Sequence, residues 1–207
     1  MRKTLILAAL LAATPIAASA DELSYTYVEG GLTQVRVDDD FLNDPHANGG
    51  YVRGSFAIAE QVNVFGGYSQ ASKNERVYGT RVKYEVGQPE LGIGYHMNMS
   101  DRVDFTADIA VLRLNVEAKI YGTPGYTGET IKDHTTAGRA TLGVRGKPSA
   151  RTEAWLKAGV IDGSDIDSEF VGVLGGQVKF NKTWGLVAEV QMMQDVTQYS
   201  TGVRASF

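Results

Sequence analysis

Apolar and polar residues alternate with a period of two along almost the whole chain after residue 20. Within residues 51–58, Val52, Phe56 and Ile58 occupy one parity, whereas Arg53 and Ser55 occupy the other. Successive side chains of a strand point to opposite faces, so this segment predicts a strand with one apolar and one polar face. After residue 20 we find no window with the 3.6-residue period of an amphipathic helix. The pattern therefore predicts an all-β fold.

Ten segments of the chain are predicted to be strands. They cover residues 23–36, 48–58, 62–70, 88–97, 102–118, 135–145, 151–160, 168–180, 184–194 and 197–207. Most are at least as long as the roughly 9–11 residues that a tilted strand needs to cross a hydrocarbon core. Short connections at 59–61, 98–101, 146–150 and 181–183 alternate with longer polar ones at 37–47, 71–88, 119–134 and 161–167. Because tight periplasmic turns and long external loops are typical of outer-membrane barrels, we predict a transmembrane antiparallel up-and-down β-barrel of ten strands, with eight as the alternative.

The fifth predicted strand contains a break in the alternation. Phe105 and Ile109 share one parity, whereas Leu112, Leu114 and Val116 share the other. An extra residue inserted into the strand, a β-bulge, would produce this change. A strand that extends above the membrane would produce it as well, and the sequence leaves both explanations open.

The first twenty residues are predicted to be a signal peptide. Residues 1–3 are basic, residues 5–13 form an apolar run too short to span a bilayer, and Ala18-Ser19-Ala20 matches the small-x-small cleavage pattern. We therefore expect Ala18 and Ala20 to direct cleavage, which would remove residues 1–20 and leave residues 21–207 as the barrel domain. Loss of Arg2 and Lys3 would change the formal net charge from −4 to −6.

Composition and motifs argue against several classes of function. The chain is mildly acidic and its sequence has no run of Lys and Arg, which disfavours nucleic acid as a partner. It has no cysteine, and its three histidines are too scattered in sequence to suggest a metal site. We find neither a Gly-x-Ser-x-Gly motif nor a phosphate-binding glycine loop, so we predict no cofactor and no enzymatic activity. Asp133 and His134 at an outer strand end leave a rim hydrolase as a remote alternative.

Charged residues gather on the parity opposite the apolar one. If the apolar parity faces lipid, the barrel interior receives six acidic and six basic residues: Glu29, Arg53, Glu90, Asp104, Asp108, Arg139, Arg145, Glu153, Lys157, Lys179, Glu189 and Arg204. On the lipid face, an Arg or Lys at the bilayer midplane would cost roughly 2–4 kcal/mol. Inside, the charges can pair. Together with Tyr25, Tyr27 and Trp155 they predict a polar plug, and a narrow passage for ions or small solutes is the alternative.

The last predicted strand carries an apolar face that ends on an aromatic residue. Tyr199, Val203 and Phe207 share this face. The arrangement resembles the signal by which the barrel-assembly machinery recognises its substrates, so we expect that machinery to be a partner.

Three longer segments, residues 23–31, 64–69 and 176–185, together with the closing Ser206-Phe207, are similar to a known group. They resemble the xanthomonad family of small outer-membrane β-barrels once linked to plant immune activation and quorum sensing. The resemblance implies an outer-membrane location, including shed vesicles, and implies no catalytic residues. The predicted function is structural or surface-interacting, through external loops that would contact lipopolysaccharide, membrane lipid, a host or a neighbouring cell. The predicted loops at 71–88 and 119–134 depart from the pattern of the family in length and charge.

Overall fold

The computed structural model describes residues 23–37, 46–77, 80–121, 128–164 and 166–207. The predicted signal peptide, with Ala18 and Ala20, lies outside these residues. Ten strands follow one another along the chain: β1 (Tyr27–Val37), β2 (His46–Ala59), β3 (Val62–Val77), β4 (Thr80–Ser100), β5 (Val103–Ile120), β6 (Glu129–Ser149), β7 (Thr152–Gly163), β8 (Ile166–Lys179), β9 (Trp184–Met193) and β10 (Val196–Ser206). No helix within the described ranges is both long and apolar enough to cross a membrane.

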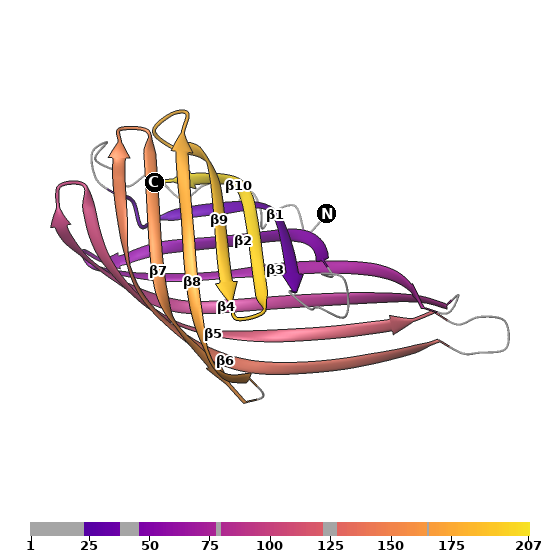
Figure 1. Ribbon diagram of the computed structural model, residues 1–207. Coiled ribbons are helices and arrows are strands. Elements are labelled where there is room, and N and C mark those ends of the chain that lie inside the picture. The colour runs from indigo at the N-terminus through magenta and orange to yellow at the C-terminus, as the bar shows by residue number, and fades with distance from the viewer. Residues whose placement is uncertain (1–22, 38–45, 78–79, 122–127, 165) are drawn as a thin grey trace.

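The strands form a closed antiparallel barrel in which each strand pairs with its neighbours in sequence (Figure 1). The first and last strands close it, from the pair Tyr27 and Ser206 to the pair Val37 and Val196. Beyond this ladder, the backbone N–H of Phe207 donates to the carbonyl of Thr26 at 2.9 Å. Closure leaves no unpaired edge inside the bilayer, where water cannot satisfy backbone groups. The ten-stranded prediction is confirmed, and the eight-stranded alternative is wrong.

The predicted long connections are mostly strand rather than loop. Residues 71–88 contain the end of β3 and the beginning of β4, and residues 119–134 contain the end of β5 and the beginning of β6. The sequence predicts loops here because these parts are rich in polar residues, although Val82, Tyr84 and Val86 alternate with polar residues as in a strand. The predicted connection 161–167 is likewise mostly strand. At residues 194–195 the chain turns tightly between β9 and β10, with Gln194 at a positive φ of 36°.

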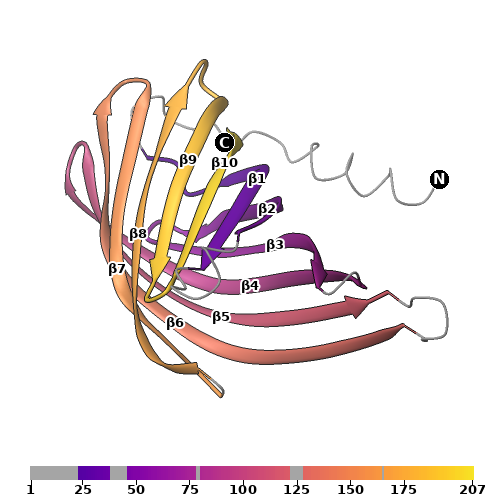
Figure 2. The same ribbon diagram turned by 45° about the vertical axis from the view of Figure 1, so that its right-hand side comes forward.

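The barrel wall is much higher on one side than on the other. Strands β3 to β6 contain 16, 21, 18 and 21 residues, whereas the other strands contain 10 to 14. Since the turns at the periplasmic ends are short, the extra residues lie at the external ends (Figure 2). About eight extra residues on each of β4, β5 and β6, at ~3.3 Å each and a tilt of ~40°, project roughly 20 Å beyond the membrane. We call residues 73–77, 80–87, 113–120 and 129–136 the projection.

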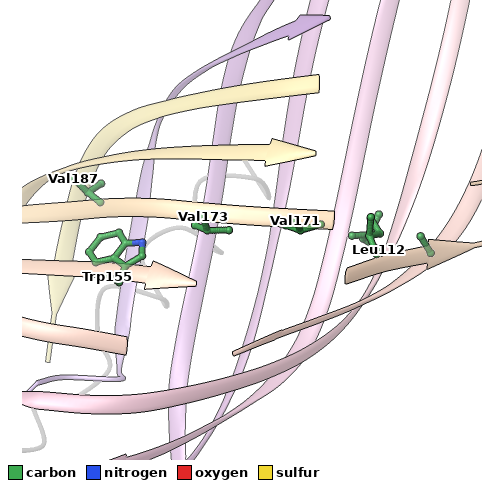
Figure 3. Packing of buried hydrophobic residues seen from close by; sticks show 7 residues of the cluster. Leu112, Trp155, Val171, Val173 and Val187 are labelled. Carbon is green, nitrogen blue, oxygen red and sulfur yellow. The ribbon is translucent and has the colours of Figure 1, made fainter. Parts of the chain in front are cut away.

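The membrane-spanning part of the barrel is apolar outside and mainly polar inside. Leu32, Leu91, Ile109 and Phe170 point outward, and each is 65–69 % exposed. Such exposure to water would be unfavourable for so many large apolar side chains, whereas contact with lipid is favourable. Among the buried side chains, polar and charged ones outnumber hydrophobic ones. An exception is an apolar cluster of interior residues on β5 to β9, shown in Figure 3, which consists of Leu112, Ala137, Trp155, Ile161, Val171, Val173 and Val187.

Candidate functional site

A chain of ion pairs crosses the barrel interior. The buried carboxylate of Glu29 accepts hydrogen bonds from Arg53 and, at 2.5 Å, from Arg204. Arg53 also donates to Glu189 at 2.6 Å, and the indole of Trp155 donates to the other oxygen of Glu189 at 2.7 Å. Because Arg53 lies on β2 and Glu189 on β9, their contact spans the lumen between strands that are not neighbours. These residues link β2 and β9 across the two strands, β1 and β10, that lie between them.

A second group of ion pairs also lies inside the barrel. Glu153 pairs with Arg145 and with Lys179, each at 2.5 Å. Elsewhere, Arg139 pairs with Glu90 at 2.5 Å and donates to Gln191 at 3.2 Å, which again joins strands that are not neighbours. Removing one partner of such a buried pair typically costs about 3–5 kcal/mol, because it leaves an uncompensated charge. The interior charges are therefore mutually dependent.

The structure places all twelve of the predicted lumen charges on the inner side of the barrel wall. Eleven are in ion pairs, including Asp108 with Lys157, and Asp104 accepts a hydrogen bond from Tyr25 at 2.8 Å. The sequence analysis missed Lys147, which is buried although it lies within a predicted turn. It also missed His96, whose imidazole stacks on Tyr25 with ring centroids 3.6 Å apart. The inward parity of His96 was visible in the sequence, but the stacking partner was not.

Tyr25, which precedes β1, points into the barrel near its periplasmic end. Besides Asp104 and His96, its ring contacts the guanidinium of Arg145 at 4.8 Å from the centroid. Farther along the chain, Arg204 lies over the rings of Tyr27 and Trp155, at 4.0 and 4.9 Å. Beside these layers there is a cavity of about 160 Å³, lined in part by Tyr51, Arg53 and Glu90. Aromatic rings and ion pairs thus narrow the lumen.

The strands of the projection exchange their apolar and polar faces relative to the membrane-spanning part. On β5 the outward residues Ile109 and Val111 are followed outward by Arg113, Glu117 and Lys119. The inward charges of the same strand give way to three apolar residues, which are Leu112, Leu114 and Val116. On β4 the outward run of apolar residues that ends at Leu91 is followed by Glu85 and Lys83, whereas Val86 and Tyr84 point inward.

The exchange of faces occurs without any change in strand register. β5 pairs with β6 without interruption from Val103 and Gly146 to Ile120 and Glu129. The register with β4 is likewise constant from Val82 and Ile120 down to Asn98 and Asp104. The break in the sequence pattern is therefore caused by the extension above the membrane, and the β-bulge explanation is wrong for this part of β5. The position of the exchange marks the external boundary of the apolar band.

Five charged residues form a connected network on the outward face of the projection. Lys119 contacts Glu85 at 2.6 Å and Glu117 at 3.3 Å, Lys83 contacts Glu85 at 2.9 Å, and Lys132 contacts Glu117 at 3.6 Å. Hydrogen bonds from Lys119 and Lys83 hold the pKa of the Glu85 carboxyl below its ordinary value. The same contacts raise the pKa of Lys119, with the hydrogen bond to Glu85 as the largest cause. The contact between Glu85 and Lys119 thus favours the charged form of both side chains.

Asp133 and His134 on β6 do not form a side-chain pair. The hydrogen bond between them runs from the backbone N–H of His134 to the carboxylate of Asp133 at 2.8 Å, so the imidazole is not involved. Adjacent side chains on a strand point to opposite faces. Among the described residues, no group of three or more His, Asp or Glu side chains could hold a metal ion.

These features define an integral membrane β-barrel whose lumen contains paired charges and whose external wall is raised on one side. The sequence matches the family model described as outer membrane protein beta-barrel domain over residues 4–206. The chain therefore belongs to this family, and its location is the outer membrane. No curated protein sequence is a match for it.

Solved structures with the same fold have very different sequences. The translocator domain of the autotransporter NalP from Neisseria meningitidis is similar, with a TM-score of 0.56 and 12 % identity, covering 100 % of this chain and 98 % of that one. The protease OmpT from Escherichia coli has a TM-score of 0.52 and 7 % identity, and the match covers 91 % of this chain and 100 % of OmpT. The attachment invasion locus protein Ail of Yersinia pestis has a TM-score of 0.50 and 12 % identity, and the match covers 88 % of this chain and 97 % of Ail. At such low identity these likenesses show the shared barrel fold alone.

Proposed function

We propose that this protein is a closed barrel that presents the projection at the cell surface for interaction with a partner. The observation that carries the proposal is the raised wall of β3 to β6, because strands of 21 residues are about twice as long as membrane crossing requires. A barrel needs no such extension for its own closure. The ion pairs and aromatic rings inside the barrel support the same proposal, because they narrow the lumen and leave the external surface as the main place where function can reside.

The edge of the projection suggests how a partner would bind. β6 pairs with β7 from Ala137 downward, and the backbone N–H of Ser164 donates to the carbonyl of Thr136 at 3.2 Å. In the described part of the chain, residues 129–134 therefore have β5 as their only strand partner. An exposed edge of this kind can accept a further strand through backbone hydrogen bonds. The inner face beside it carries Tyr84, Val116 and Ile131, which are 39–54 % exposed. An extended segment of a surface protein, with apolar residues on one face, fits both features.

Shortening one hairpin tests this proposal. Asn115 pairs directly with His134, so residues 116–133 can be replaced by an Asn-Gly turn without a change of register below it. We expect the variant to fold, as judged by heat-modifiable migration on a gel, and to lose attachment to host or neighbouring cells and biofilm formation. The control variant carries the same turn at residues 164–165, between β7 and β8. Unchanged attachment in the folded, shortened protein would contradict the proposal.

A narrow channel is the second candidate function, and the cavity of about 160 Å³ among interior charges favours it. It predicts stable single-channel steps when refolded protein is inserted into a planar bilayer. A plug held by ion pairs predicts silence from protein that migrates as the folded form. Conductance steps that change size in Arg53→Gln would assign them to this lumen.

We also propose the finer features of export. Cleavage after Ala20 predicts a mature chain that begins at Asp21, which mass spectrometry of the purified outer-membrane protein can test. Tyr199 and Val203 lie on the outward face of β10, 43 % and 41 % exposed, where the barrel-assembly machinery could contact them together with Phe207. The similarity of residues 23–31, 64–69 and 176–185 supports membership of the xanthomonad group and release on vesicles.

A rim hydrolase would require Asp133 and His134 to act together. Substitution of both by Ala is expected to leave any lipase or protease activity of the purified protein unchanged.

A further inference from the structure

Six basic residues from four strands gather on the outward face of the projection, although they are scattered in sequence. We call them the cationic belt: Arg76, Arg81, Lys83, Arg113, Lys119 and Lys132. Two belt pairs stand directly opposite each other across strands, Arg76 with Arg81 and Lys83 with Lys119. Like charges placed opposite each other are unfavourable unless something compensates them. The carboxylates of the network on this face, Glu85 and Glu117, compensate the belt only in part, so its cations outnumber them.

The belt directly continues the lipid-facing surface of the barrel. On β5, Arg113 follows Val111 on the same face, one side chain above the exposed apolar band. Two residues of strand rise about 7 Å, which is the depth of a headgroup layer. Lys119, on the same face, lies roughly 15 Å higher at the usual strand tilt. Arg113 therefore faces the base of the headgroup layer, whereas Lys119 can be reached only by headgroups that extend further from the membrane, such as those built from several sugars.

The chemistry of the belt fits phosphate. Guanidinium and ammonium groups bind phosphate oxygens through charge-assisted hydrogen bonds, and Arg can do so with two at once. Lys119 is held between Glu85 and Glu117, so part of its position is fixed before a ligand arrives. The ammonium group of Lys132 lies 3.6 Å from the carboxylate of Glu117, and the Lys132 side chain is 70 % exposed. Arg113, Arg76 and Arg81 are also exposed, so their donors can reach a ligand.

From the position and charge of the belt we infer that it binds the phosphorylated headgroups of outer-leaflet glycolipids. This binding would fix the projection relative to the membrane surface. The local excess of positive charge stands out because the chain as a whole is acidic, with a net charge of −4. The inference does not depend on the proposed cell-surface partner, which would bind the opposite face and the edge of β6.

The test compares two triple variants of the full-length protein refolded in detergent. The belt variant is Arg81→Gln, Arg113→Gln and Lys132→Gln; the control variant is Arg102→Gln, Arg151→Gln and Lys182→Gln, which removes three exposed cations at the periplasmic turns. Both must show heat-modifiable migration. The probes are a bisphosphorylated lipid A glycolipid, the same glycolipid after enzymatic dephosphorylation, and inorganic phosphate, with binding counted by native mass spectrometry.

We expect the unaltered protein and the control variant to bind the phosphorylated glycolipid, and the belt variant to bind it at least tenfold more weakly. Binding should weaken as salt is raised. Equal binding of the dephosphorylated glycolipid would overturn the inference, as would equal loss in both variants. Binding of inorganic phosphate as tight as that of the glycolipid would show an anion site without lipid specificity, which would also overturn it. Attachment to cells by the belt variant reports separately on the proposed function.

Discussion

The membrane-spanning part of β4 and β5 and their continuation in the projection use the same strands in the same register but opposite faces. Below the exchange, apolar side chains such as Ile109 point outward and Asp108 points inward; above it, Lys119 points outward and Val116 inward. The backbone cannot account for this reversal, because the strand register is the same on both sides of it. The difference teaches that the surrounding medium, lipid below and water with headgroups above, sets which parity of a strand is apolar.

Removal of an interior carboxylate is expected to cause the largest loss of stability. In Glu29→Gln, Arg53 and Arg204 both lose their shared partner inside the barrel. We expect the free energy of unfolding to fall by about 3–5 kcal/mol, as for other broken buried pairs. Urea unfolding of protein folded in lipid vesicles measures this change. The matched substitution in the projection, Glu85→Gln, should leave the unfolding midpoint almost unchanged, and equal losses would abolish the distinction between the two regions.

A cavity created in the interior apolar cluster should cause the next largest loss of stability. Leu112 is 2 % exposed and packs within the cluster, whereas Val116, on the same parity four residues higher, is 43 % exposed. Leu112→Ala is expected to cost about 3 kcal/mol, because the packed neighbours cannot fill the space that is left. Val116→Ala should cost much less. The same unfolding assay in vesicles measures the free energy of unfolding of both variants. A larger loss of stability for Val116→Ala than for Leu112→Ala would show that the projection is covered in the membrane.

A charge on the outward face should distinguish lipid from headgroup surroundings. Ile109 is 66 % exposed, so Ile109→Lys places an ammonium group in lipid and should cost about 2 kcal/mol. Glu117→Lys puts the same group on the same face of β5, eight residues higher, and is expected to change unfolding in vesicles little. If both variants lose stability equally, the boundary lies above Glu117 rather than near Val111.

Much of this architecture could be predicted from the sequence because a bilayer imposes a simple alternation on each strand. The strand order, the barrel closure and the inward direction of residues such as Glu153 follow from that alternation. The height of β4 and β6 could not be predicted, because polar residues like Lys83 and Asp133 in a strand above the membrane resemble those of a loop. The cationic belt was also hidden, since its six cations come from four strands that only the register brings together. The sequence contained two signals of the projection, which are the change of parity at Leu112 and the alternation of Val82, Tyr84 and Val86 with polar residues.

The smallest expected effect concerns the titration of Glu85, which tests whether the outward network exists in solution. Its pKa in the folded protein lies below the ordinary value of 4.5, chiefly because Lys119 and then Lys83 donate hydrogen bonds to it. A lowered folded-state pKa means that the carboxylate contributes stability above its unfolded pKa, and that this contribution is lost as the pH falls through the folded value. Lys119→Gln should therefore raise the pKa of Glu85 toward 4.5, whereas Lys132→Gln, which removes a contact to Glu117, should shift it less. Carboxyl NMR of selectively labelled protein in micelles would follow both variants. An unshifted Glu85 in Lys119→Gln would mean that these lysines are not held by carboxylates, and that the belt meets the headgroups as independent cations.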